Sequence, residues 1–138
     1  MANSTIYRSG TILKNLINDN WTLSKKPQVD FIWDEKSVGF MDDREDSILI
    51  TSTNENTRYF GLYGRDFYHT ISFRIDSYTY QNFEYHENFV NEIFRILKES
   101  IRSDDYVVLL ITDSRHENDS YRNIYKHVIT VDIQQFNP

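Results

Sequence analysis

A change in the spacing of apolar residues near the middle of the chain constrains the fold more than any other feature. From His69 to Ser77 apolar side chains alternate with polar ones, which is the pattern of a strand with one buried face. From about Tyr85 to Arg102 they recur instead at helical spacing. These helical positions are Phe89, Val90, Ile93, Phe94, Leu97 and Ile101. The sequence therefore predicts a strand that is followed, after a short linker, by a long amphipathic helix.

Shorter patterns on either side supply the other elements. A first helix is expected from about Ser4 to Asn18, although Gly10 lowers its helix propensity. Four further strands are expected where β-branched and aromatic residues gather between polar clusters. They cover about Gln28–Trp33, Ser47–Ser52, Tyr106–Ile111 and Tyr121–Gln135.

These elements give the order α-β-β-β-α-β-β within 138 residues, the usual size of one domain. Hairpin-like neighbours outnumber helical crossovers in this order, which favours antiparallel pairing. We predict an α+β fold in a single domain over residues 1–138. It has a mostly antiparallel sheet of about five strands, with two helices packed on one face.

Two segments between the strands are rich in turn-forming residues. Thr53–Phe67 combines asparagines and glycines with aromatic residues, which predicts a loop with exposed aromatic side chains. Asp113–Ser120 is polar throughout and predicts a turn region.

Charge and residue usage exclude several classes of function. The net charge is −6, whereas binding to a phosphate backbone depends on clustered Lys and Arg, so nucleic acid is not expected as the main ligand. Asp30–Asp46 is the most acidic stretch and indicates either a solvated loop or a surface for a basic partner. With no cysteine, no signal peptide pattern and no apolar run of membrane-spanning length, we expect a soluble protein of the cytoplasm with no membrane partner.

The aromatic content points in the same direction. Ten Tyr and nine Phe are many for a chain of this size. Tyrosine combines an apolar ring with a polar tip, which suits contact surfaces between proteins, although strands use aromatic residues as well.

A search for catalytic patterns finds no phosphate loop, nucleophile elbow, zinc-type histidine pair or calcium loop. The tripeptide His-Glu-Asn occurs twice, at His86 and at His116, and we interpret this as chance repetition rather than a metal site. His69 and His127 fall on the apolar faces of strands, as core or edge histidines rather than ligands do. We therefore predict no metal, no cofactor and no enzymatic activity.

Two alternatives stay open. Asp34-Glu35-Lys36 follows a strand directly, so a carboxylate could hold Mg²⁺ beside an activating amine as in metal-dependent nucleases. Asp19, Asp30 or Asp46 would supply a second ligand. Alternatively, the acidic surface could mimic DNA and inhibit a host protein.

On the long helix, Glu92, Lys98 and Glu99 are interpreted as a solvent-facing charged surface.

Taken in order, several segments carry a resemblance to a known family. They are the opening helix, the strand pair around Phe31 and Ile48, the strand Tyr68–Asp76, the long helix ending at Lys98, the strand Tyr106–Leu109, Arg115, and the closing strand Tyr125–Ile133. Over most of its length the chain resembles the tail terminator and tail-completion (head-tail joining) proteins of tailed viruses. These proteins share a topology and a pattern rather than invariant motifs.

The resemblance implies a structural virion protein located at the junction of tail and neck. It would form a homo-oligomeric ring, expected to be a hexamer, that stops polymerisation of the tail tube. Its partners would be copies of itself, the tail tube protein and the neck or connector protein, with DNA only passing through the lumen. The family has no catalytic residues to transfer.

The resemblance also implies that the long loops between the early strands reach neighbouring subunits, the tube or the lumen. The candidate interface residues are Asp34, Glu35, Asp42, Asp43, Glu45, Tyr59, Phe60 and Tyr63. An acidic lumen would let DNA pass by like-charge repulsion. The loop around Tyr59–Tyr63 differs in length from the family pattern, which leaves the ring contacts open.

Overall fold

The order of helices and strands agrees with the prediction. The structure is a computed structural model that describes residues 5–32, 45–60, 66–103, 106, 108–118 and 124–136. Its elements are the helix α1 (Thr5–Asp19), the strands β1 (Gln28–Ile32), β2 (Ser47–Phe60) and β3 (Asp66–Thr79), the helix α2 (Phe83–Glu99), and the strands β4 (Val108–His116) and β5 (Tyr125–Phe136). The predicted α+β class is confirmed.

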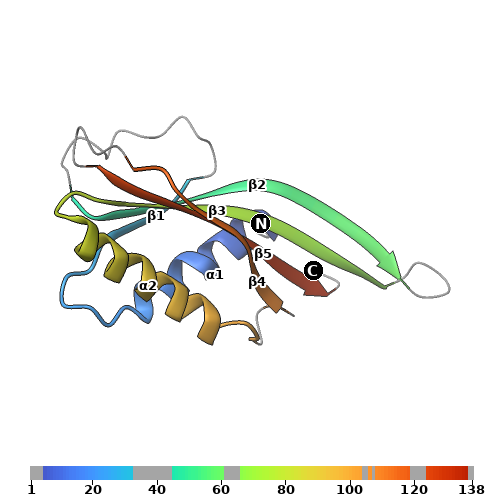
Figure 1. Cartoon of the computed structure of the whole chain (residues 1–138). Helices are drawn as coiled ribbons and strands as arrows, with labels where there is room; N and C mark the ends of the chain where they lie inside the picture. The colour runs from blue at the N-terminus through green and yellow to red at the C-terminus, as the bar shows by residue number, and fades with distance from the viewer. Residues whose placement is uncertain are drawn as a thin grey trace.

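The strands form one five-stranded sheet in the order β1-β2-β3-β5-β4. β1 lies parallel to β2, and the other three neighbouring pairs are antiparallel. The prediction of a mostly antiparallel sheet is therefore confirmed. β3 is the central strand, and β2 and β3 form a long ribbon that runs past the helices (Figure 1).

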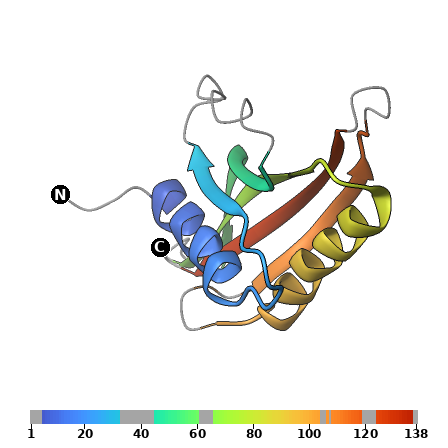
Figure 2. The ribbon, with the colours of Figure 1, turned by 90° about the vertical axis from the view of Figure 1, so that its left-hand side faces the viewer.

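Both helices pack on the same face of the sheet, as predicted (Figure 2). Their apolar faces and the inward side chains of the strands build one hydrophobic core. Its fully buried members include Leu13, Ile17, Ile48, Ile50, Ile71, Phe73, Ile75, Ile93, Leu97, Ile129, Val131 and Ile133. The alternation seen from His69 to Ser77 thus corresponds to the core face of β3.

A close approach between α1 and β1 explains the glycine in the first helix. A Cβ atom at Gly10 would lie 2.4 Å from Cζ of Phe31, well inside van der Waals contact. Phe31 in turn packs edge-on against Phe73, with 5.9 Å between ring centroids. Gly10 therefore lowers the helix propensity of α1 but allows α1 to contact the edge strand β1.

The predicted loop over Thr53–Phe67 is wrong for the part that the structure describes. β2 continues to Phe60, and its register with β3 runs on to the pair Phe60 and Asp66. Asn54 and Asn56 suggested a loop because Asn is rare in strands, but pairing with a strongly alternating neighbour outweighs this preference. A β-bulge between Ser52 and Asn54 absorbs the irregularity.

The predicted turn over Asp113–Ser120 begins too early. β4 continues through Asp113 and Ser114 to His116, which is the Cα partner of His127 on β5. A second irregularity between Ile111 and Asp113 lets the polar end of β4 keep its pairing.

Glu92 does not face solvent, although Lys98 and Glu99 do. Its side chain is buried against the segment that follows α1, where Thr22 donates two hydrogen bonds to Oε2. Arg95 binds the other carboxylate oxygen and also donates to the backbone oxygen of Asn20. This network joins α2 to the end of α1, because a buried charge must be paired.

Within the described residues, neither helix combines the length and apolar character that crossing a bilayer requires.

Candidate functional site

The residues predicted to form an interface divide into three groups. Glu45 lies just before β2 and is exposed. Tyr59 and Phe60 belong to β2, where Phe67 and Asp66 are their respective Cα partners on β3. The others, Asp34, Glu35, Asp42, Asp43 and Tyr63, lie outside the described residues.

The outer part of the β2–β3 ribbon forms a distinct surface, which we name the arm and define as residues 54–60 and 66–72. β1 ends at Ile32, whose partner is Thr51, so β2 has no second neighbour beyond this point among the described strands. The bulge between Ser52 and Asn54 lies at the same place. The arm therefore presents an open strand edge, and an open edge can pair with another chain.

Asp46 is the last residue of the acidic stretch, and its contacts hold it in place. Its carboxylate is buried and accepts a hydrogen bond from the hydroxyl of Tyr85 on α2. Lys25 lies 3.9 Å from the same oxygen, and the backbone oxygen of Asp46 accepts from the nitrogen of Gln28. This carboxylate is therefore engaged in holding α2 and β1 to the start of β2.

The carboxylates expected to assist a nuclease do not gather in the described part of the chain. Asp30 accepts from the side chain of Gln28, and Asp46 is held by Tyr85. Asp34, Glu35 and Lys36 lie outside the described residues. Among the described residues, the group of side chains that could hold a metal ion consists of histidines instead.

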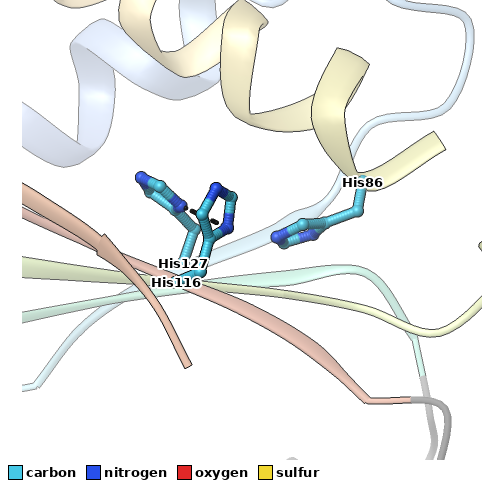
Figure 3. Close-up of side chains that lie close together, drawn as sticks. All are labelled: His86, His116 and His127. Atoms are coloured by element: carbon cyan, nitrogen blue, oxygen red, sulfur yellow. Dashed lines mark hydrogen bonds between the residues drawn. The ribbon is translucent and has the colours of Figure 1, made fainter. Parts of the chain in front are cut away.

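His86, His116 and His127 converge between the start of α2 and the β4–β5 hairpin. Each ring offers one nitrogen, and these three nitrogens lie within 4.8 Å of one another. Figure 3 shows the ring of His86 reaching from the first turn of α2 toward the two strand histidines. We name these three residues the histidine cluster.

Hydrogen bonds fix two of the three rings. Nδ1 of His86 lies 2.8 Å from Oγ1 of Thr79, and Nε2 of His127 lies 2.7 Å from Oγ of Ser114. Nδ1 of His127 faces Nδ1 of His116 at 3.0 Å, so one of these nitrogens must carry the proton. Nε2 of His86 is buried and has no partner among the described residues.

The cluster lies in an apolar, aromatic setting. Phe83 and Tyr125 pack against His116 and His86, and the Phe94 ring contacts His127 edge-on with 5.9 Å between centroids. His86 and His127 are buried, while His116 is exposed. The cluster is thus buried at His86 and His127 and open to solvent at His116.

Burial, together with repulsion from the neighbouring imidazoles, lowers the pKa of both His86 and His127 to about 4. Both rings are therefore neutral at neutral pH, which is the form of histidine that coordinates metals.

The sequence pattern does not predict this cluster, because the cluster depends on contacts between separate elements that local residue spacing does not encode. The polar stretch Asp113–Ser120 predicts a turn at His116, yet His116 pairs with His127 across the hairpin. The helical spacing places His86 at the start of the long helix, but it does not determine which way the first turn of that helix points. The useful signal was that His127 continues the core face of β5 with Ile129 and Val131.

In comparisons with known proteins, no protein-family model and no curated protein matches the chain.

Proposed function

We propose that the chain is a structural subunit of a viral tail that assembles with copies of itself into a ring. The ring, expected to be a hexamer, caps the head-proximal end of the tail tube and joins it to the neck or connector. DNA passes through the lumen without being bound specifically. The subunit is made in the host cytoplasm and ends in the virion, at the junction of tail and neck.

The observation that supports this proposal is the arm. Beyond Thr51 the edge of β2 carries backbone N–H and C=O groups with no second neighbour among the described strands. Such an edge pairs readily with a strand of another chain. A closed ring requires one surface that contacts a different surface on the next copy, and the arm is suited to be the first of these.

Charge also fits the proposed role. The net charge of −6 and the acidic stretch up to Asp46 disfavour adhesion of DNA to a lumen wall, because like charges repel. Glu45, the described member of the acidic interface set, is exposed as this role requires.

Light scattering coupled to gel filtration tests the proposal, on the chain alone and mixed with the tail tube protein encoded nearest to its gene. We expect a discrete ring with the tube protein, and tubes that stop growing in electron micrographs. Failure of the intact chain to bind the tube protein would overturn the proposal.

A shortened arm provides the decisive variant. Thr57 and His69 are Cα partners, so an Asn-Gly turn can replace residues 58–68 without changing the register of the remaining ribbon. We expect this variant to fold but to lose assembly and capping. The control is Leu23→Ser, which removes an exposed apolar side chain before β1, at the end of the sheet opposite to the arm. Assembly by the shortened variant at the level of the control would contradict the role of the arm.

A further inference from the structure

We propose that the histidine cluster, His86, His116 and His127, binds one divalent transition-metal ion, and that this ion is zinc. The site is separate from the arm and does not depend on ring assembly. It would hold the ion with three protein ligands and leave a fourth position that faces solvent.

The unpartnered nitrogen of His86 is the first observation that points to a ligand. A buried polar atom without a hydrogen bond costs free energy, and native proteins rarely leave one so. His86 is fully buried, yet its Nε2 atom has no partner among the described residues. A metal ion on this nitrogen would satisfy it.

The facing pair of His116 and His127 is the second observation. Their Nδ1 atoms lie 3.0 Å apart, close to the separation of about 3.3 Å between two nitrogens that bind a tetrahedral zinc ion at 2.0–2.1 Å. A metal ion would replace the proton that these nitrogens now share. The three ligand nitrogens all lie within 4.8 Å of one another, so the widest separation must shrink by at most about 1.5 Å to reach that spacing. His116 is exposed and can turn to bring its nitrogen closer to the others.

The hydroxyl groups of Thr79 and Ser114 can accept the ring N–H that His86 and His127 carry in the tautomers that a metal needs. Metal-binding histidines usually donate their other ring N–H to a polar partner, which fixes ring orientation. When Nδ1 of His86 donates to Thr79, Nε2 presents a lone pair to the cluster. When Nε2 of His127 donates to Ser114, its Nδ1 does the same.

The donor set selects the class of metal. Three imidazoles suit zinc, copper, nickel and cobalt, whereas magnesium and calcium require oxygen ligands. The described cluster contains no carboxylate. Zinc with three histidines and one water is a common tetrahedral arrangement. The ion would connect the first turn of α2 to both strands of the β4–β5 hairpin.

The test uses the full chain without an affinity tag, treated with a chelator and then titrated with zinc chloride in a calorimeter. We expect one equivalent to bind and to raise the melting temperature by roughly 5–10 °C when free zinc exceeds Kd about a hundredfold. Cobalt chloride should give the visible absorption bands of a four-coordinate ion with nitrogen ligands. Absence of binding at micromolar zinc would overturn the proposal.

Single histidine variants separate this site from adventitious binding. His116→Ala removes an exposed ligand, so the variant should fold normally and bind zinc at least about tenfold more weakly. His86→Leu should abolish the cobalt spectrum while filling the buried space. The matched control is His69→Gln, because His69 is the remaining histidine of the chain and contacts Glu55 on the arm. Equal zinc affinity in the His116 and His69 variants would contradict the assignment.

Discussion

Thr22 donates two hydrogen bonds to the carboxylate of Glu92, one from its backbone nitrogen and one from its hydroxyl, each 2.6 Å long. The two residues lie far apart in the sequence, on the segment after α1 and on α2. Arg95 binds the other oxygen of the same carboxylate at 2.6 Å. The buried negative charge of Glu92 is therefore paired with a positive charge where α2 contacts the segment after α1.

We expect Glu92→Gln to lower the free energy of unfolding by about 1–3 kcal/mol, because a neutral amide accepts these hydrogen bonds less strongly and leaves Arg95 without its buried partner. Urea unfolding, followed by tryptophan fluorescence to which the buried Trp21 contributes, measures the change. Glu99→Gln is the control, because Glu99 binds the same Arg95 from an exposed position and should matter little. Equal losses in the two variants would contradict the special role of Glu92.

The stability of the protein should fall at acidic pH because of the same residue. Burial opposes ionisation of Glu92, but hydrogen bonds from Arg95 and Thr22 outweigh it and lower the pKa from 4.5 to about 2. The folded state therefore takes up this proton less readily than the unfolded state. The contribution, of the order of 3 kcal/mol, is present above pH 4.5 and is lost as the pH falls toward 2.

Urea titrations between pH 6 and pH 2.5 test this dependence. The difference in stability between the wild-type chain and Glu92→Gln should narrow steadily as the pH falls. A difference that stays constant over this range would show that the carboxylate of Glu92 is not the group that titrates.

Gly10→Ala should destabilise the protein even though alanine favours helix. The helix propensity gain is about 1 kcal/mol, but the new methyl group would lie 2.4 Å from the Phe31 ring, and overpacking costs about 1–3 kcal/mol. Thermal unfolding measures the balance. Asn15→Ala, on the exposed side of α1, should be neutral or stabilising, and the opposite order of the two variants would refute the close approach.

Tyr85 and Asp46 should be energetically coupled. Burial, aided by the hydrogen bond to Asp46 and its negative charge, raises the pKa of Tyr85, so the phenol stays a donor at neutral pH. We expect Tyr85→Phe to cost about 1–3 kcal/mol, because among the described residues it leaves the carboxylate of the buried Asp46 with only the more distant Lys25. In a double-mutant cycle with Asp46→Asn, the two losses should add to more than the loss in the double variant.

The order of elements could be predicted because it depends on local periodicity. The helical spacing around Phe89 and Ile93 and the alternation around Ile71 and Phe73 identify α2 and β3 directly. The extent of the strands could not be predicted in the same way. β2 continues through Asn54 and Asn56 because β3 lies beside it, and no local preference reports on that neighbour.

Side-chain roles that depend on packing were also beyond the sequence. Glu92 has the spacing of a solvent-facing residue, and only the course of the chain at Thr22 buries it. The histidine cluster requires the register between His116 and His127 and the position at which α2 begins. Contacts between residues distant in sequence therefore decide the candidate metal site, whereas local patterns decide the framework that holds it.

The central ladder between β3 and β5 has a consequence for how the chain folds. It pairs Tyr68 with Phe136 at one end and Thr79 with Tyr125 at the other, across the whole of α2. During synthesis β3 can form its hairpin with β2 early, but its second edge stays open until the final strand leaves the ribosome. Closing such a long loop is slow, so completion of the sheet should be the rate-limiting event of folding. Until then the edge of β3 that later pairs with β5 is free, and an unpaired strand edge makes the nascent chain prone to aggregation.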